Sequence, residues 1–241
     1  MYTLFTAIGL GALAAIIPLG FGVDVTWTLL PGFFVGVIGF VWMNRRVGKR
    51  VEALTKLADA ELANAQAVAQ RSGGKAGSVM LRGIDASVTK LQAAVMFSKW
   101  QLGLGSMLNA RIGMMIYTKT VVLAQANKKA AIPETLQQAL PYLEKAQVGS
   151  IKAKLLSALW PAWAMLAFTN YRLKKDFSIV TAVMDKAIAA APKNGILWSM
   201  YGWLLAKEGH TEQAIVILAR GVEAAPDDAH LKENYSLLQN N

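Results

Sequence analysis

Apolar residues fill the first 44 positions of the chain almost without interruption. The run 2–22 carries no charged side chain and is rich in Leu, Ile, Ala and Phe. A second run, 26–44, is bracketed by Trp27 and Trp42. A helix of about 20 apolar residues can cross a hydrocarbon core, and tryptophan is enriched at both headgroup levels. The pattern therefore predicts a transmembrane hairpin of two helices over residues 1–44, with Asp24 as its single charge.

Charges around the apolar runs suggest how such a hairpin would be oriented. A cleaved signal peptide is the alternative for the first run, but no Lys or Arg precedes it and a second apolar run follows at once. Arg45, Arg46, Lys49 and Arg50 follow the second run directly, whereas the connection has no basic residue. The positive-inside rule then predicts a multi-pass protein of the cytoplasmic (inner) membrane of a bacterium, with the N-terminus and the C-terminal domain in the cytoplasm.

Small residues recur four positions apart in both apolar runs. Gly32 and Gly36 lie on one face of the second run, and Gly11 and Ala15 share a face of the first. Such spacing lets helix backbones approach closely in lipid, although glycine is also simply common in membrane helices. We therefore expect Gly32 and Gly36 to pack within the hairpin or against other subunits. No ionisable residue lies inside either run, which argues against a transporter or channel acting alone.

After position 44 the apolar residues become periodic. Steps of three and four residues place one stripe on a helix that ends near Arg71, namely Val47, Val51, Leu54, Ala58, Leu62, Ala65 and Val68. The segment SGGKAG at 72–77 interrupts the helix, and Ile84, Val88, Leu91 and Val95 restart the stripe. No two-residue alternation occurs in this part of the chain, so 45–132 is expected to be a basic amphipathic helical region in an all-α protein.

The charge of the chain is concentrated in that helical region. The 241 residues carry a formal net charge of +10, and 44–132 holds 14 Lys and Arg against four Asp and Glu. Basic residues close to an apolar segment favour anionic lipid as a partner, with Arg45, Arg46, Lys49 and Arg50 facing the lipid. Nucleic acid is the rival, but the charges are scattered and form no recognition module, so no nucleic-acid partner is expected.

A period of 34 residues organises the C-terminal part. Pro133 opens an amphipathic helix, and further helices are expected over 150–174, 177–190, 196–207, 211–224 and 229–239. Their short connections favour antiparallel hairpins. Pro192 and Pro226 end the segments AIAAAP and VEAAP, and lie 34 positions apart.

The segment 195–228 resembles a unit of the tetratricopeptide repeat family. Trp198, Gly202, Ala214 and Pro226 occupy family positions, with Tyr201, Leu205 and Leu218 in place of the usual Leu, Tyr and Phe. The segment 161–194 matches less well, because Phe168 stands where a small residue is usual. The resemblance implies a cytoplasmic α-solenoid over 133–241, with repeats 161–194 and 195–228 and a capping helix at 229–239.

The same resemblance implies a non-catalytic protein-interaction module. In this family the first helix of each unit lines a groove that accepts a peptide or partner helix. The corresponding residues here are Met165, Leu166, Thr169, Arg172, Leu173, Ser199, Met200, Trp203 and Lys207. Arg172 and Lys207 are expected to hold a carboxylate of the partner. Ordinary packing against neighbouring helices is the alternative role for all of them.

Residues suited to catalysis or metal binding are sparse. His210 falls in the turn of the best repeat, and His230 lies in the capping helix. Without cysteine, and about twenty residues apart, the two do not form a metal site. No phosphate-binding loop is present, because LGLG at 102–105 lacks the Lys and Ser or Thr that would contact phosphate and Mg²⁺. We expect no enzyme activity, no cofactor and no metal.

Together these patterns predict a membrane-anchored adaptor or scaffold that assembles or recruits a protein partner in a membrane complex. Its partners would be that protein, membrane lipids, and other membrane-complex subunits or further copies of the chain. The alternative is a membrane-surface protein whose basic helices bind anionic lipid and tether or shape the membrane.

Overall fold

The computed structural model describes the chain except for residues 1, 21–24, 101–102, 149–158 and 240–241, and it leaves the side chains of 3–4, 14–20, 25–32 and 148 undescribed. The described residues form ten α-helices and two short 3₁₀ turns, with no strand. The expectation of an all-α protein is confirmed for them. The helices divide into two compact units, residues 1–112 and 113–241. The predicted segments 1–44, 45–132 and 133–241 are a different division, because one helix runs through position 44.

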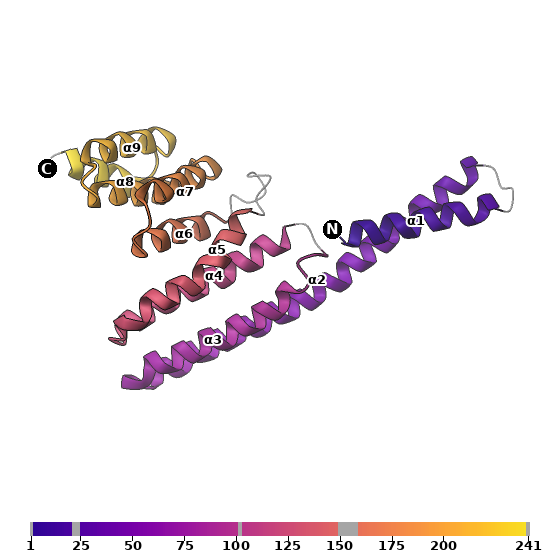
Figure 1. Cartoon of the computed structure of the whole chain (residues 1–241), viewed down its shortest axis with the longest axis horizontal. Coiled ribbons are helices and arrows are strands. Elements are labelled where there is room, and N and C mark those ends of the chain that lie inside the picture. The colour runs from indigo at the N-terminus through magenta and orange to yellow at the C-terminus, as the bar shows by residue number, and fades with distance from the viewer. Residues whose placement is uncertain (1, 21–24, 101–102, 149–158, 240–241) are drawn as a thin grey trace. The chain divides into compact units, whose positions relative to one another are not determined.

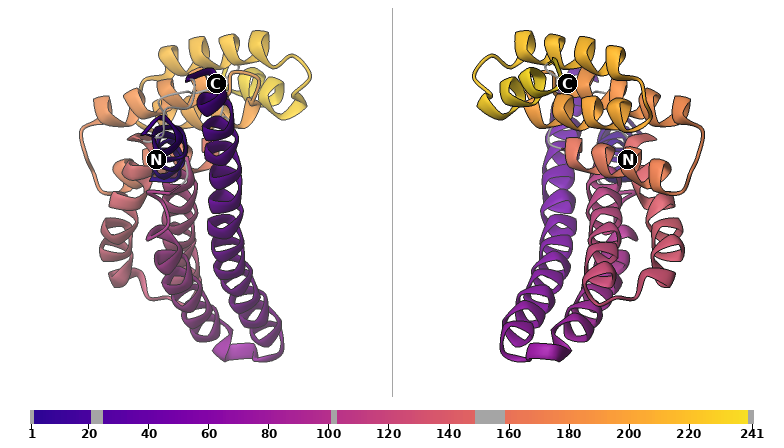
Figure 2. Two further views of the ribbon diagram at one scale, coloured as in Figure 1. Left: turned by 90° about the vertical axis from the view of Figure 1, so that its right-hand side faces the viewer. Right: turned by 90° about the vertical axis from the view of Figure 1, so that its left-hand side faces the viewer.

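Unit 1 is a set of long antiparallel helices. Helix α1, Tyr2–Gly20, folds back along the beginning of α2, Val25–Arg71 (Figure 1). A 3₁₀ turn at Gly73–Lys75 reverses the chain, and α3, Ala76–Val95, returns along α2 (Figures 1 and 2). Helix α4, Leu104–Gln125, begins in unit 1 and ends in unit 2.

The prediction of a transmembrane hairpin over 1–44, and with it a multi-pass inner-membrane location, is wrong. A span requires about 20 consecutive apolar residues in one helix. Within the described parts of α1 to α10, no helix is both long enough and apolar enough to cross a membrane. In α2 the apolar residues pass without a break into the charged segment that begins at Arg45, so they do not form a helix of their own.

Small residues on α1 and α2 do bring the two backbones close together. A Cβ atom added at Gly36 would lie 3.1 Å from the carbonyl oxygen of Ala7 and 3.5 Å from the Cα of Gly11. Any larger side chain at position 36 would therefore push the helices apart. Gly32, named with Gly36 in the sequence, belongs to the part of α2 whose surroundings are not described.

The contact between α2 and α3 is a seam of small residues. Ala58, Leu91 and Ala94 are fully buried, and a Cβ added at Gly83 would overlap the Cβ of Ala65. The buried Ser87 hydroxyl donates to the carbonyl oxygen of Ala58 at 2.7 Å across the seam. The apolar stripe predicted for 47–68 faces α3, except that Ala69 is buried where Val68 was expected and Val68 is exposed.

Unit 2 consists of shorter helices joined in hairpins. They are the end of α4, then α5 (Ile132–Val148), α6 (Trp160–Arg172), α7 (Phe177–Ala190), α8 (Gly195–Lys207), α9 (Thr211–Ala224) and α10 (Ala229–Gln239). The helix expected over 150–174 is observed from Trp160 onward, and residues 149–158 lie outside the described part. Figure 2 shows α6 to α9 as consecutive antiparallel pairs.

Asp and Asn side chains start three of these helices. Asp176, Asn194 and Asp228 each accept a hydrogen bond from a backbone N–H of the helix that follows, in α7, α8 and α10. These N-caps satisfy donors that a helix leaves unpaired at its first turn. Short connections can therefore separate the hairpins without unpaired amides at these positions.

The crossing of α8 and α9 explains the small residues of the second repeat. A Cβ added at Gly202 would lie 2.7 Å from Leu218, and one added at Gly221 would lie 2.6 Å from the Cβ of Trp198. Ala214 is fully buried in the same crossing. The Trp198 indole donates to the carbonyl oxygen of Pro192 at 2.7 Å and so ties the repeat to the end of the preceding one.

Candidate partner-binding surface of the helical repeats

The first helices of successive hairpins lie side by side. Trp203 of α8 stacks on Phe168 of α6, with ring centroids 5.7 Å apart, and meets Tyr171 edge-on at 6.3 Å. On its other side, α8 accepts a hydrogen bond at the Ser199 hydroxyl from the Asn234 amide of α10, at 3.1 Å. Helices α6, α8 and α10 therefore form one row.

Helix α8 presents an apolar stripe on this row. Ile196, Met200, Trp203 and Lys207 follow one another at steps of four, three and four residues, so they share one face of the helix. Ile196 is 53% exposed and Trp203 is 49% exposed, while Tyr201 and Leu205 on the opposite side of the helix are buried. We call these four residues the α8 stripe. Ile196 and Trp203 are its exposed apolar side chains.

The corresponding face of α6 is closed. Leu166 and Thr169 are buried, and Met165 is half-buried, so these positions offer little surface to a partner. Arg172 is exposed, but its guanidinium donates to the Thr120 hydroxyl of α4 at 3.3 Å. The predicted groove residues are therefore divided: Trp203 and Lys207 of α8 are exposed, Ser199 and Met200 are half-buried, and those of α6 pack mostly inside unit 2.

Sequence reasoning missed Ile196, which extends the stripe by one turn. The four-residue step from Met200 back to Ile196 is visible in the sequence and would have included it. Ser199 was predicted as a groove residue, and its hydroxyl is occupied by Asn234. Contact with a capping helix cannot be read from residue spacing, because it depends on where α10 packs.

A basic hollow lies at the turn between α6 and α7. About 530 Å³ in volume, it is lined by Tyr171, Arg172, Lys174, Lys175, Phe177 and Glu208. Lys175 pairs with Glu144 at 3.8 Å. Burial raises the pKa of Tyr171, and its hydrogen bond with Glu208 acts in the same direction. Glu208 directly follows Lys207, so the hollow adjoins the cationic end of the α8 stripe.

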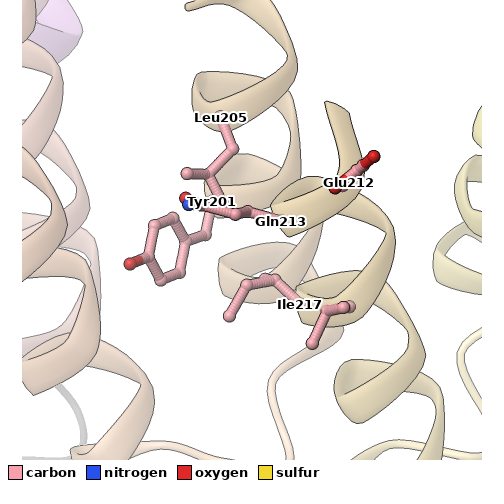
Figure 3. Close-up of a pocket in the computed structure, with 6 residues that line it drawn as sticks. Tyr201, Leu205, Glu212, Gln213 and Ile217 are labelled. Atoms are coloured by element: carbon pink, nitrogen blue, oxygen red, sulfur yellow. The ribbon is translucent and has the colours of Figure 1, made fainter. Parts of the chain in front are cut away.

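A second hollow of about 370 Å³ lies between α8 and α9 (Figure 3). Tyr201, Leu205, Glu212, Gln213, Val216 and Ile217 line it. Burial raises the pKa of Tyr201 to about 12, and the carboxylate of Asp185 on α7 adds to this effect. The phenol is therefore a neutral packing group that joins α8 to the preceding hairpin.

Tyr201 is expected to titrate later than a free tyrosine. Because its pKa is near 10 in an unfolded chain and about 12 in the folded one, its contribution to stability is complete below pH 10 and is lost as the pH rises toward 12. Tyrosinate absorbance should show a group that titrates near pH 12 and that Tyr201→Phe removes, whereas the raised titration of Tyr171 should remain. Thermal unfolding of the variant should also depend less on pH in this window. A Tyr201→Phe protein with an unchanged late titration would contradict the assignment.

The two histidines lie on the surface. His210 stacks on Phe177 with ring centroids 5.6 Å apart, and His230 is near Glu233 at 3.9 Å. Across the described residues, no group of three or more metal-ligating side chains comes together. The expectation that the chain is not an enzyme stays an expectation.

The basic residues predicted to face lipid lie together on α2. Arg45, Arg46, Lys49 and Arg50 are all exposed, and the Arg46 guanidinium lies 5.2 Å from the centre of the Trp42 ring. They belong to unit 1 and not to the repeats.

Comparison with known proteins agrees with the repeat geometry. No curated protein matches the chain. The tetratricopeptide repeat family matches residues 180–238, which extend from within α7 to within α10 and include the whole α8–α9 hairpin. This match confirms the predicted resemblance for the C-terminal part and indicates a protein–protein interaction or scaffold role for residues 180–238.

Proposed function

We propose that the C-terminal repeats recruit or assemble a protein partner through the α8 stripe. The observation that carries this proposal is the exposure of Ile196 and Trp203 on a helix whose opposite side, with Tyr201 and Leu205, is buried. Exposed aromatic and aliphatic side chains on a folded helix are costly to hydrate and are typical of contact sites.

The two ends of the α8 stripe differ in chemical character. Its start is apolar at Ile196, and its end carries Lys207, beside the hollow that contains Arg172 and Lys174. A partner helix or extended peptide with apolar residues and a carboxylate at one end would match this order. Aromatic contact at Trp203 would provide most of the binding free energy, and the cations would set the direction of the bound segment.

The α8 stripe can be tested with a pair of matched variants. Trp203→Glu places a charge in the centre of the stripe, and Val216→Glu makes the same kind of change at an equally exposed position on α9. With full-length protein as bait, the amount of a partner captured from native extract should fall at least about tenfold for Trp203→Glu. It should be unchanged for Val216→Glu. Circular dichroism checks that both variants remain helical.

The capture results distinguish binding of a partner at the α8 stripe from binding elsewhere and from self-association. Equal capture by both variants and the unchanged protein would contradict the α8 stripe as the binding surface. If the captured protein is the chain itself, and sedimentation shows an oligomer that Trp203→Glu dissociates, the repeats serve self-association. Lys207→Glu should weaken capture of a partner with an acidic end but leave a purely apolar contact unaffected.

A further inference from the structure

A small pocket in unit 1 brings two arginines together with aromatic rings. It has a volume of about 240 Å³ and lies where α2 passes the segment that follows α3. Met43, Arg46, Val47 and Arg50 come from α2, and Phe97 and Trp100 come from the other side. None of these residues belongs to the repeats, so the pocket is independent of the function proposed for them.

The beginning of the chain helps to hold this pocket in place. The backbone N–H of Tyr2 donates to the carbonyl oxygen of Lys99 at 2.9 Å. The Tyr2 ring also meets the Trp100 ring edge-on, with centroids 5.6 Å apart. Two parts of the chain that are distant in sequence therefore meet at Trp100, which forms the wall opposite α2.

The ionisable side chains that line the pocket are both cationic. Arg46 and Arg50 line it, and Arg45 and Lys49 are exposed on the same turns of α2. The sequence has no Asp or Glu in 25–51 or in 86–133, the segments that form the pocket apart from Tyr2. The next acid along α2, Glu52, pairs with Lys56 at 2.7 Å. Paired guanidinium groups without a carboxylate are suited to bind phosphate oxygens.

Large apolar side chains are exposed beside these cations. Met96 is 78% exposed, Ile38 is 66% exposed and Trp42 is 58% exposed. Arg46 packs over the Trp42 ring, so a cation and an exposed aromatic ring adjoin at this point of α2. Free phosphate or a nucleic-acid backbone would leave the apolar side chains in water. A phospholipid has both the anionic group and the apolar part that this surface fits.

We propose that this pocket binds the phosphate headgroup of an anionic phospholipid at a membrane surface. Arg46 and Arg50 contact the phosphate oxygens, Arg45 and Lys49 add attraction to neighbouring headgroups, and Trp42 lies at the level of the headgroups, where tryptophan is favoured. The binding requires contact with a surface and does not require a helix to cross it.

The experiment measures co-sedimentation of the full-length protein with vesicles. One set contains phosphatidylcholine alone, and the other contains phosphatidylcholine mixed with phosphatidylglycerol. The test variant is Arg46→Ala with Arg50→Ala. The matched control is Arg71→Ala with Arg82→Ala, which removes the same charge from exposed positions at the far end of the α2–α3 hairpin. Circular dichroism verifies the fold of each variant.

We expect the unchanged protein to prefer the vesicles that contain phosphatidylglycerol. Arg46→Ala with Arg50→Ala should lower its affinity for them at least about tenfold, and the control pair should lower it no more than about twofold. Arg46→Lys with Arg50→Lys, which keeps the charge but removes the guanidinium groups, should recover the binding only in part. Calorimetric titration with inorganic phosphate should show no binding under the same conditions.

Three results would overturn the proposal. The first is equal binding to both kinds of vesicle by the unchanged protein. The second is an equal loss in the test and control pairs, which would mean that only net charge matters. The third is binding of inorganic phosphate that also releases the protein from vesicles, which would make the pocket a site for free anions.

Discussion

Replacing Gly83 by valine should open the α2–α3 hairpin and lower the free energy of unfolding of the protein by about 3 kcal/mol. Even a Cβ at position 83 would overlap the Cβ of Ala65 on the facing helix. The Ala65 Cβ is attached directly to the backbone and cannot rotate away, so relief requires the two helices to separate. Separation in turn exposes Ala58 and lengthens the buried hydrogen bond between Ser87 and Ala58.

Hydrogen exchange can locate this effect. Amides of α2 and α3 near positions 58–65 and 83–91 should exchange faster in Gly83→Val, whereas amides of α8 and α9 should not change. Gly48→Ala is the matched control, because nothing lies within 4 Å of a Cβ added there and alanine favours the helix. That control should be neutral or stabilising by a few tenths of a kcal/mol. Equal protection from hydrogen exchange in Gly83→Val and the unchanged protein would show that the contact between α2 and α3 has room for a larger side chain.

Replacing Gly221 by valine should disrupt the second repeat, at a cost of about 3 kcal/mol and roughly 10 °C in Tm. A Cβ at position 221 would lie 2.6 Å from the Cβ of Trp198. Trp198 is buried and its indole is held by the carbonyl of Pro192, so the ring cannot move without loss of that hydrogen bond.

Glu223→Val serves as the control for Gly221→Val. It places the same β-branched residue two positions along α9, at an exposed site, so only the helix crossing distinguishes the two variants. Thermal unfolding by circular dichroism and near-ultraviolet signals of Trp198 should change in Gly221→Val alone. A similar small change in both variants would indicate that α8 and α9 can separate without loss of packing.

Local signals in the sequence predicted the helices and the repeat well. The 34-residue spacing of Pro192 and Pro226 identified the unit that the family comparison matches, and Gly202 and Ala214 stand at its helix crossing. These signals succeed because capping, turn formation and helix crossing each depend on a few neighbouring residues.

The transmembrane prediction failed because it did not rest on such local signals. It was based on average apolarity and on flanking charges, neither of which shows where a helix begins and ends. In the structure, α2 continues from Val25 to Arg71 and joins apolar and charged residues in one helix. No described helix provides a span.

The candidate binding surface was predicted only in part. Family positions identified Met200, Trp203 and Lys207, which lie on the open α8 stripe. The same rule also selected Thr169 and Arg172, of which the first is buried and the second is hydrogen-bonded to Thr120. Residue spacing shows that positions share a helix face, but it cannot show which neighbouring helix covers that face.

By itself, the sequence determined that the chain is helical, that its C-terminal part is built from 34-residue units, and that small residues mark the crossings. These properties depend on local spacing and side-chain size. Only the tertiary structure decided that the α8 face is open while the α6 face is closed. It also decided that Arg46 and Arg50 share a pocket with Phe97 and Trp100. Exposure and convergence arise from contacts between residues far apart in the chain, and no local pattern of apolar and polar positions encodes them.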